Sequence, residues 1–280
     1  MILAPAKINL YLHVTGKRPD SYHLLDSLVV FADAADELRI ELAKDFSLEI
    51  TGEFANLVDI NDNSVKKAAE SLQKYSGEQG SCKITLKKNL PVGAGIGGGS
   101  SDAAATLLVL NDLWKLNLSG GELQKIGLKI GADVPVCLAR RSSVMSGIGE
   151  EIREIKLPPL NLLLVNPDVQ VSTTKVFSMG FDKFSAPAAK VKNFDSLEEL
   201  VRFLSRTRND MEENAIKIAP EIAEVLLAIS RQKGCLLARM SGSGATCFGI
   251  FDTVENSRAA AIAIGKEKKS WWAKATRTFD

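Results

Sequence analysis

A glycine-rich segment in the middle of the chain leads directly into a segment with helical periodicity. Residues 91–101 read Pro-Val-Gly-Ala-Gly-Ile-Gly-Gly-Gly-Ser-Ser. Glycine has no Cβ, so successive backbone N–H groups can turn into one concavity. The next segment predicts a helix that is capped by Ser100 and Ser101 and buries Ala103, Leu107, Leu110 and Trp114. Because the N-terminus of a helix attracts anions, we expect this segment to bind polyphosphate.

Two other phosphate-binding motifs fit the segment less well. A P-loop needs a lysine after its last glycine, and none follows here. Gly93, Gly95 and Gly98 have the spacing of the dinucleotide fingerprint, and Asp112 follows about 20 residues later. Asp112 lies inside the predicted helix, however, so we interpret that match as accidental. A purely structural glycine turn is the remaining alternative, and the entropy cost of so many glycines argues against it.

Composition excludes several classes of partner. The chain has 280 residues, enough for one large domain or two ordinary ones, and we predict two. Its net charge is +1, with 35 basic and 34 acidic residues, so no global field recruits nucleic acid or a membrane surface. Four scattered cysteines and two histidines do not predict a zinc site. Without a secretory leader pattern or a long apolar stretch, we expect a cytoplasmic protein with small-molecule partners.

The first part of the sequence predicts a β-rich α+β domain over residues 1–157. Residues 3–14 alternate between apolar and polar side chains, which indicates a half-buried strand. Further strands are expected at 36–42, 46–51 and 82–87. Helices are expected at 64–75, between a cap at Asn63 or Ser64 and a stop at Gly77, and at 119–130, ended by Gly131. Residues 147–149 predict a turn between two short strands.

The second part predicts a ferredoxin-like domain over residues 158–280. The expected order is strand, helices, strand, strand, helix, strand. The strands are expected at 160–165, 235–240, 246–251 and 271–279, and the helices at 172–179, 195–205, 210–232 with a break at Pro220, and 254–268. Residues 180–193 are interpreted as an exposed excursion.

Two isolated charged residues are candidates for chemistry. Asp133 follows the helix-stop Gly131 and precedes Pro135, which predicts a stiff connection into an extended segment. It is equally well interpreted as a turn or N-cap acid and as a general base. Lys7 lies on the strand face opposite the aliphatic side chains, where an ammonium is either solvated or directed into a cleft. Phosphoryl transfer needs a phosphate cradle, a positive charge and a carboxylate, and residues 91–101, Lys7 and Asp133 would supply them.

Six short motifs occur in order along most of the chain. They are Ala4-Pro-Ala-Lys-Ile-Asn-Leu, Arg18-Pro-Asp-Ser-Tyr-His, residues 91–101, Gly131-Ala-Asp-Val-Pro, Gly147-Ile-Gly-Glu and Ser241-Gly-Ser-Gly-Ala-Thr. Together they resemble the superfamily of galactokinase, homoserine kinase, mevalonate kinase and phosphomevalonate kinase. The first two motifs are similar to the member that phosphorylates a cytidine diphosphate-linked polyol in the non-mevalonate isoprenoid route. The resemblance implies a ribosomal protein S5 domain 2-like ATP-binding domain followed by the ferredoxin-like domain.

The resemblance also implies roles for single residues. Asp133 would be the general base and Lys7 its charged partner for transfer of the γ-phosphoryl of ATP to the 2-hydroxyl of the methylerythritol moiety. ATP would contact Pro91, Val92, Gly93, Ala94, Gly95, Ile96, Gly97, Gly98, Gly99, Ser100 and Ser101. The accompanying Mg²⁺ would take the Ser101 hydroxyl as an oxygen ligand. The polyol substrate would contact Asn9, Tyr22, His23, Thr173 and Phe177, with Tyr22 stacked on cytosine and His23 hydrogen-bonded to it.

A second, shorter glycine loop would shape the phosphate region. It comprises Ser241, Gly242, Ser243 and Gly244, and a tight hairpin turn explains it nearly as well. Where the superfamily member commonly has two glycines, this chain has Arg140 and Arg141, which puts the local turn in doubt. Without the resemblance, an ordinary loop pair packed on the sheet is the favoured interpretation of Tyr22 and His23. The alternatives for function are another kinase of the superfamily, of the homoserine or mevalonate type, and a nucleotide-binding regulator without catalysis.

Overall fold

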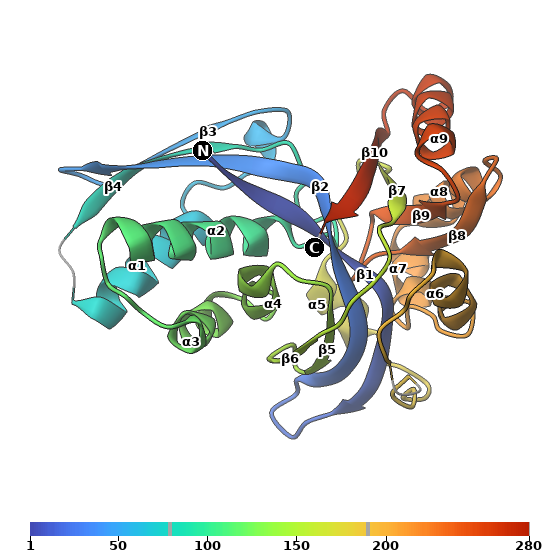
Figure 1. Ribbon diagram of the computed structural model, residues 1–280, viewed down its shortest axis with the longest axis horizontal. Helices are drawn as coiled ribbons and strands as arrows, with labels where there is room; N and C mark the ends of the chain where they lie inside the picture. Colours follow the sequence, from blue (N-terminus) through green and yellow to red (C-terminus); the bar gives the residue numbers. More distant parts are fainter. Residues whose placement is uncertain (78–79, 189–190, 280) are drawn as a thin grey trace. The chain divides into compact units, whose positions relative to one another are not determined.

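The structure, a computed structural model, describes residues 1–77, 80–188 and 191–279. It contains two compact units, each assembled from separate segments of the chain (Figure 1). The first unit comprises residues 1–6, 34–92 and 97–140, and the second comprises residues 7–33, 93–96 and 141 onward. The glycine-rich segment therefore contributes its ends to the first unit and residues 93–96 to the second.

The strands of the first unit pair around β4 (Ser81–Lys87). The second half of β2 (His23–Ala43) runs antiparallel to β4, with Leu38 opposite Leu86. On the other edge β3 (Ser47–Thr51) runs parallel to β4. A short 3-10 helix, η1 (Ala55–Leu57), follows β3. Alternation along β4 buries Cys82, Ile84 and Leu86 and exposes Lys83 and Lys87.

The helices of the first unit are α1 (Ser64–Ser76), α2 (Gly98–Leu113), α3 (Gly120–Ile130) and α4 (Val134–Ala139), and they pack on one another (Figure 1). The predicted cap of α1 and the predicted ends of α1 and α3 at glycines are confirmed. Asn63 accepts a hydrogen bond from Val65 N, and Gly77 ends α1 in the left-handed conformation. Ser119 forms a capping box with Glu122, and Gly131 follows α3.

The expectation of a half-buried first strand is wrong. Strand β1 (Ile2–Lys17) buries every side chain from Ala4 to Val14, on both of its faces. The polar residues of the strand tolerate burial because they find partners. In the second unit Asn9 Nδ2 donates to Ser27 Oγ at 2.8 Å, and the Tyr11 hydroxyl donates to Asp26 Oδ1 at 3.2 Å. Alternation of residue types thus located the strand without reporting its burial.

The second unit also holds a small sheet beside β2. Strand β5 (Ser143–Gly147) runs antiparallel to the first half of β2, with Leu28 opposite Val144. Strand β6 (Glu151–Glu154) pairs with β5, and the predicted turn at 147–149 joins them.

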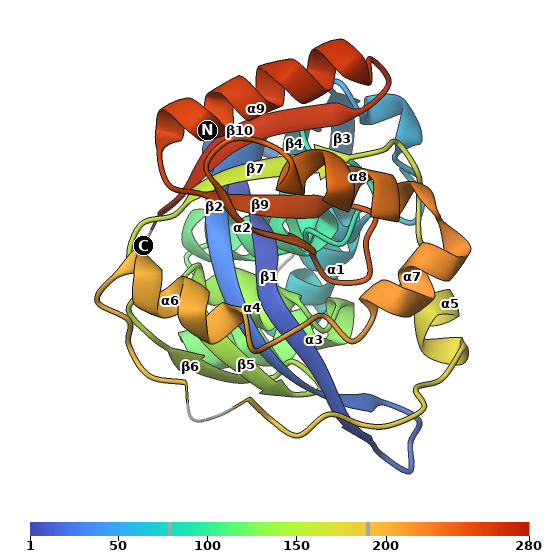
Figure 2. The same ribbon diagram turned by 90° about the vertical axis from the view of Figure 1, so that its right-hand side faces the viewer.

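The ferredoxin-like order expected beyond residue 157 is confirmed. Strands β7 (Asn161–Asn166), β8 (Cys235–Met240), β9 (Cys247–Phe251) and β10 (Trp272–Phe279) form an antiparallel sheet in the order β10-β7-β9-β8. Helices α8 (Glu221–Ser230) and α9 (Val254–Glu267) pack against this sheet (Figure 2). The other helices of this unit are α5 (Thr173–Ser178), α6 (Leu197–Leu204) and α7 (Glu212–Ile218), and Pro220 separates α7 from α8.

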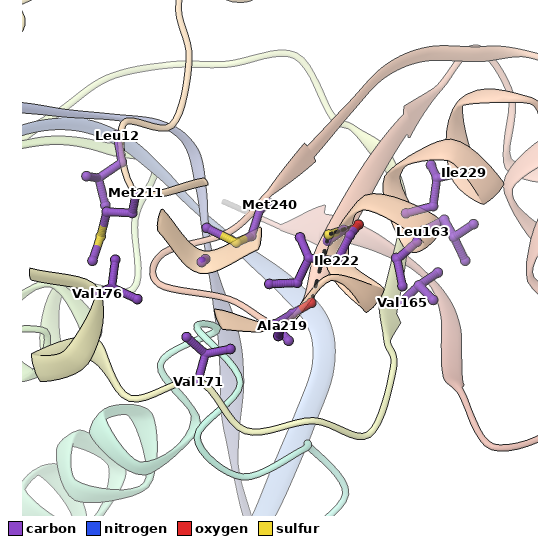
Figure 3. Packing of buried hydrophobic residues seen from close by; sticks show 14 of the residues in the cluster. Leu12, Leu163, Val165, Val171, Val176, Met211, Ala219, Ile222, Ile229 and Met240 are labelled. Atoms are coloured by element: carbon purple, nitrogen blue, oxygen red, sulfur yellow. Dashed lines mark hydrogen bonds between the residues drawn. The ribbon is translucent and has the colours of Figure 1, made fainter. Parts of the chain in front are cut away.

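One cluster of buried apolar residues packs β1 against the sheet and helices of the ferredoxin-like part of the second unit. Ile222 and Ile229 of α8 pack with Leu163 and Val165 of β7 (Figure 3). The same cluster contains Leu12 and Val14 of β1 together with Met240 at the end of β8. This packing supports the turn between β8 and β9, which carries the second glycine loop.

The prediction that residues 180–193 are exposed is confirmed for most of the described residues, but their backbone is attached to the strands of the second unit. Ser185 N donates to Val14 O at 2.9 Å, and Ala188 N donates to Asp26 Oδ2 at 2.6 Å. These hydrogen bonds hold the segment against β1 and β2. The polar composition of the segment indicated exposed side chains, but it did not indicate these backbone hydrogen bonds. Residues 189 and 190 lie outside the described residues.

Among the described helices, none combines the length and the apolar character needed to cross a lipid bilayer.

Candidate active site

The glycines of residues 91–101 adopt backbone conformations that other residues avoid. Gly93, Gly95 and Gly97 have φ values of 62°, 74° and 63°, in the left-handed region. The alternating pattern Gly-x-Gly-x-Gly is thus required by the path of the chain. Residues with side chains at these three positions would be strained, whether or not a ligand is present.

The glycine loop ends at the N-terminus of α2, and the predicted caps there are wrong. Gly97 occupies the N-cap position, so Ser100 and Ser101 lie within the helix. The left-handed turn at Gly97 starts the helix earlier than a serine cap would. The first carbonyl to accept a hydrogen bond within the helix is Gly97 O, to which Ser101 N donates at 2.8 Å. The amides of Gly98, Gly99 and Ser100 precede it, and such amides at a helix N-terminus are suited to bind an anion.

Asp133 precedes α4, and the expected extended segment after it is wrong. Val134–Ala139 is a short helix with Pro135 in its first turn, where proline is tolerated because its missing N–H would have no intrahelical acceptor. Asp133 takes the N-cap position with helical φ and ψ, and its side chain makes no capping hydrogen bond. The half-buried carboxylate is therefore not used to cap α4.

The turn that follows α4 forms even though this chain has Arg140 and Arg141 where the resembling kinases commonly have two glycines. Arg140 is the C-cap of α4 and has a φ of 50°, in the left-handed region. Glycine adopts this conformation without strain, whereas this chain forms the turn with an arginine. Burial lowers the pKa of Arg140 from its usual value.

Lys7 and Asn9 are two positions apart on β1, so they share one face of the strand, and both are buried. The backbone N–H of Lys7 donates to Ile96 O of the glycine loop at 2.9 Å. Asn9 N donates to Ser241 Oγ at 3.1 Å, whereas Asn9 Oδ1 is buried without a hydrogen-bond partner among the described residues. Strand β1 thus connects the glycine loop to the second glycine loop. Lys7 belongs to the second unit and Asp133 to the first, and their pairing stays a prediction.

The two glycine loops contact one another through their backbones within the second unit. Ser241 Oγ donates to Gly95 O at 3.0 Å, and Thr246 N donates to Ala94 O at 3.1 Å. A Cβ on Gly242 would lie 2.6 Å from Gly95 O, too close for any side chain. Residues 241–244 are therefore both the turn between β8 and β9 and a support for residues 93–96.

Among the predicted substrate residues, His23 and Phe177 lie against one another. The His23 and Phe177 rings stack with centroids 4.5 Å apart, and Phe181 meets both rings edge-on. Burial, followed by the charge of Lys17, lowers the pKa of His23. Thr173 instead lies at the second glycine loop, with Oγ1 2.8 Å from Ser243 Oγ. Tyr22 is 57% exposed, in the turn before β2.

A cluster of buried ionisable residues was not predicted from the sequence. Lys88 lies between Asp36 and Asp102 and forms ion pairs with both. The signal was present in the strand periodicity, because Lys88 continues the inward series Cys82, Ile84 and Leu86. Asp36 likewise has the inward parity of Leu38. A charged residue on the buried face of a strand is a sign of a partner.

The described residues include no group of three or more histidines, cysteines, aspartates or glutamates placed to hold a metal ion. The Ser101 hydroxyl is buried and has no hydrogen-bond partner among the described residues. It is therefore an oxygen at the start of α2 with its hydrogen-bonding capacity unused.

Two family models match the chain. The GHMP kinases N terminal domain matches residues 63–141, and the GHMP kinases C terminal domain matches residues 185–268. The first match contains the glycine loop and Asp133, and the second contains the second glycine loop.

Named relatives are similar to this chain over nearly its whole length. A 4-diphosphocytidyl-2-C-methyl-D-erythritol kinase of Cereibacter sphaeroides is 51% identical over 273 residues, which cover 96% of this chain and 95% of the relative. A kinase of the same name from Chelativorans sp. is 44% identical over 279 residues, covering 99% and 95%.

Solved structures show the same architecture. A 4-(cytidine 5'-diphospho)-2C-methyl-D-erythritol kinase superposes with a TM-score of 0.81 at 31% identity, covering 100% of this chain and 99% of that one. Homoserine kinase from Cytophaga hutchinsonii superposes with a TM-score of 0.70 at 17% identity, covering 99% and 93%, which is a likeness of fold alone. The predicted α+β fold with two kinase domains is confirmed. The boundary between residues 157 and 158 stays a prediction.

Proposed function

The chain belongs to the 4-diphosphocytidyl-2-C-methyl-D-erythritol kinases, within the GHMP kinases, and we propose that it phosphorylates the 2-hydroxyl of 4-diphosphocytidyl-2-C-methyl-D-erythritol. As a member of a kinase family it uses ATP as co-substrate. The observation that carries the proposal is the left-handed glycine loop that ends at the N-terminus of α2, in a chain that matches these kinases from end to end.

The proposed reaction joins the 2-oxygen of the polyol to the γ-phosphorus of ATP. The bond from the γ-phosphorus to the β,γ-bridging oxygen breaks, and ADP leaves. Such a transfer depends on positioning and on neutralising charge, since the protein supplies little covalent chemistry. The amides of residues 97–100 would hold the phosphates at the helix N-terminus.

Asp133 and Lys7 have complementary roles in the proposal. Asp133 would accept the proton of the 2-hydroxyl as the new oxygen–phosphorus bond forms. That role is supported by the position of Asp133 at the start of α4, within the region that matches the GHMP kinases N terminal domain. Lys7 would favour the ionised form of Asp133 and offset the negative charge that develops on the phosphoryl group. Its burial on β1 would make that positive charge more effective than in water.

Magnesium would accompany ATP. The orphaned hydroxyl of Ser101 fits an oxygen ligand for this ion, and Mg²⁺ commonly keeps several waters besides one or two protein oxygens. When bound, the ion would neutralise phosphate charge during transfer.

The polyol substrate would be held by the second unit. The base would meet Tyr22, His23 and Phe177, and the polyol would meet Asn9, whose buried Oδ1 has no partner among the described residues. Thr173 would lie between the substrate and the second glycine loop, since its hydroxyl already contacts Ser243. A cytoplasmic location belongs to the same proposal.

The decisive experiment is product analysis by phosphorus NMR and mass spectrometry. The purified protein with ATP and Mg²⁺ should add one phosphate to the 2-hydroxyl of the cytidine-linked polyol. Homoserine and mevalonate should stay unmodified, and CMP or CDP should compete with the polyol. Phosphorylation of homoserine or mevalonate in its place would overturn the assignment, as would ATP binding without any phosphorylated alcohol.

A further inference from the structure

A buried ionic cluster of Asp36, Lys88 and Asp102 lies against the start of α2, within the first unit. Lys88 Nζ donates to Asp102 Oδ2 at 2.8 Å and also pairs with Asp36 Oδ2. None of the three side chains is more than 4% exposed. We call these three residues the α2 cluster.

The α2 cluster connects the chain before the glycine loop with the helix after it. Asp36 Oδ1 accepts hydrogen bonds from Asn89 N at 2.6 Å and Leu90 N at 2.9 Å, directly before Pro91. Asp102 belongs to α2, directly after Ser101. Lys88 joins the two carboxylates, so residues 88–90 and α2 are tied to one another across the glycine loop.

The α2 cluster also touches the first residue of the helix. A Cβ on Gly98 would lie 3.2 Å from Lys88 Nζ and 3.6 Å from Asp36 Oδ2. The backbone that carries the first helical amides therefore rests directly on the cluster. A shift of the lysine would be transmitted to Gly98.

Hydrophobic residues of similar volume would stabilise such a position at least as well. Removing three charges from water is costly, and buried ion pairs seldom contribute more stability than apolar packing does. What an ionic cluster supplies in addition is directional geometry, because each charge-assisted hydrogen bond fixes a donor relative to its acceptor. A glycine-rich loop has the most conformational freedom to lose on binding, so fixing its two ends lowers the entropy cost of holding a ligand.

We propose that Asp36, Lys88 and Asp102 are positioning residues for nucleotide binding, which hold the N-terminal amides of α2 in place before ATP binds. The inference rests on the proposed assignment of residues 91–101 as the ATP loop. The α2 cluster acts through the backbone of residues 97–100 and does not touch the nucleotide.

The test compares three substitutions in the full-length protein. Asp102→Ala removes the acceptor of Lys88, and Asp102→Asn keeps an oxygen in its place. Asp112→Ala is the matched control, because Asp112 is an exposed aspartate on the same helix. Asp102→Leu, which fills the position with an apolar side chain instead of leaving a cavity, replaces Asp102→Ala if the alanine variant does not fold.

Two readouts are measured for each variant. Loss of one charge-assisted hydrogen bond in Asp102→Ala should raise the KM for ATP about tenfold, with kcat changed by less than about threefold. Amide hydrogen exchange at residues 97–101, measured without nucleotide, should become faster. Asp102→Asn should restore both values, and Asp112→Ala should match the wild type.

Wild-type KM and wild-type amide exchange in a folded Asp102→Ala or Asp102→Leu variant would overturn the inference. An Asp102→Asn variant as impaired as the alanine variant would overturn it as well, because an amide oxygen would then fail to replace the acceptor. A wild-type protein that does not turn over ATP contradicts the proposed function instead. The exchange measurement still decides the inference in that case, since it uses no substrate.

Discussion

The imidazole of His23 lies flat on the phenyl ring of Phe177, with an angle of 14° between the two planes. The residues are 154 positions apart in sequence, and the fold brings them together from the start of β2 and from α5. Phe181 meets both rings edge-on and supports the pair from one side. A flat aromatic surface of this kind suits the planar base of a nucleotide.

We predict that Phe177→Leu weakens binding of the cytidine-linked substrate. Loss of one stacking surface should raise its KM about tenfold, because stacking contributes roughly 1–3 kcal/mol per base. The KM for ATP should stay within about twofold. Steady-state kinetics with each substrate varied in turn would measure this. Phe184→Leu, at a phenylalanine that is exposed in the same unit, is the control. Equal changes in both KM values would contradict a base-binding role.

Asp133→Asn should abolish most of the turnover. Removing the general base costs about 10²- to 10⁴-fold in kcat, whereas the affinity for ATP should be retained. Single-turnover kinetics and calorimetric titration with ATP separate the two effects. Asp112→Asn, an identical change at an exposed aspartate of α2, should have wild-type kinetics. Turnover within about tenfold of wild type would exclude a proton-accepting role for Asp133.

Gly95→Ala should destabilise the protein. The φ of 74° at Gly95 disfavours any L side chain, and a new Cβ would lie 2.7 Å from Gly244 N. We expect a loss of about 1–3 kcal/mol in the free energy of unfolding, measured by denaturant titration. Gly121→Ala in α3 is the contrast, since a Cβ there meets nothing within 4 Å. That variant should be stabilised by about 0.5–1 kcal/mol. Equal stability of both variants would show that the backbone of the glycine loop is not constrained.

The ionisation of Asp102 should make the free energy of unfolding depend on pH. The substitution Asp102→Asn should remove this dependence. Burial and the charge of Asp36 together raise the pKa of Asp102 to about 7, against the opposing charge of Lys88. In the unfolded chain an aspartate ionises near pH 3.9, so ionisation favours the unfolded state across the interval between the two values. The stability that the protonated carboxyl contributes is therefore lost as the pH rises through about 7.

The melting temperatures of the wild type and Asp102→Asn between pH 5 and pH 8 test this. Any advantage of the wild type over Asp102→Asn should be largest at pH 5 and should shrink or reverse at pH 8. A difference in melting temperature that does not vary with pH would contradict the raised pKa of Asp102.

Local signals in the sequence predicted much of the fold. The cap at Asn63 and the stops at Gly77 and Gly131 act within one helical turn, so they can be identified without knowledge of the tertiary structure. The order of elements beyond residue 157 predicted the ferredoxin-like sheet, because chain order restricts how neighbouring strands can pair.

The features that the sequence did not predict depended on residues distant in sequence. Burial of both faces of β1 requires partners such as Ser27 and Asp26, and the attachment of residues 180–188 uses Val14 and Asp26. The α2 cluster joins position 36 to positions 88 and 102. The prediction that Ser100 and Ser101 cap α2 was wrong for a local reason. Gly97 in the left-handed conformation starts the helix before either serine.

The apolar cluster of the second unit unites Leu12 and Val14 with Phe251, Ala260 and Ile264. During synthesis, the earliest of these side chains emerge long before their last neighbours exist. Contacts across such separations slow folding and prolong the exposure of sticky surface. The interior of the second unit therefore cannot be completed until Ile264 has left the ribosome, so a chain truncated before that residue would lack part of this core.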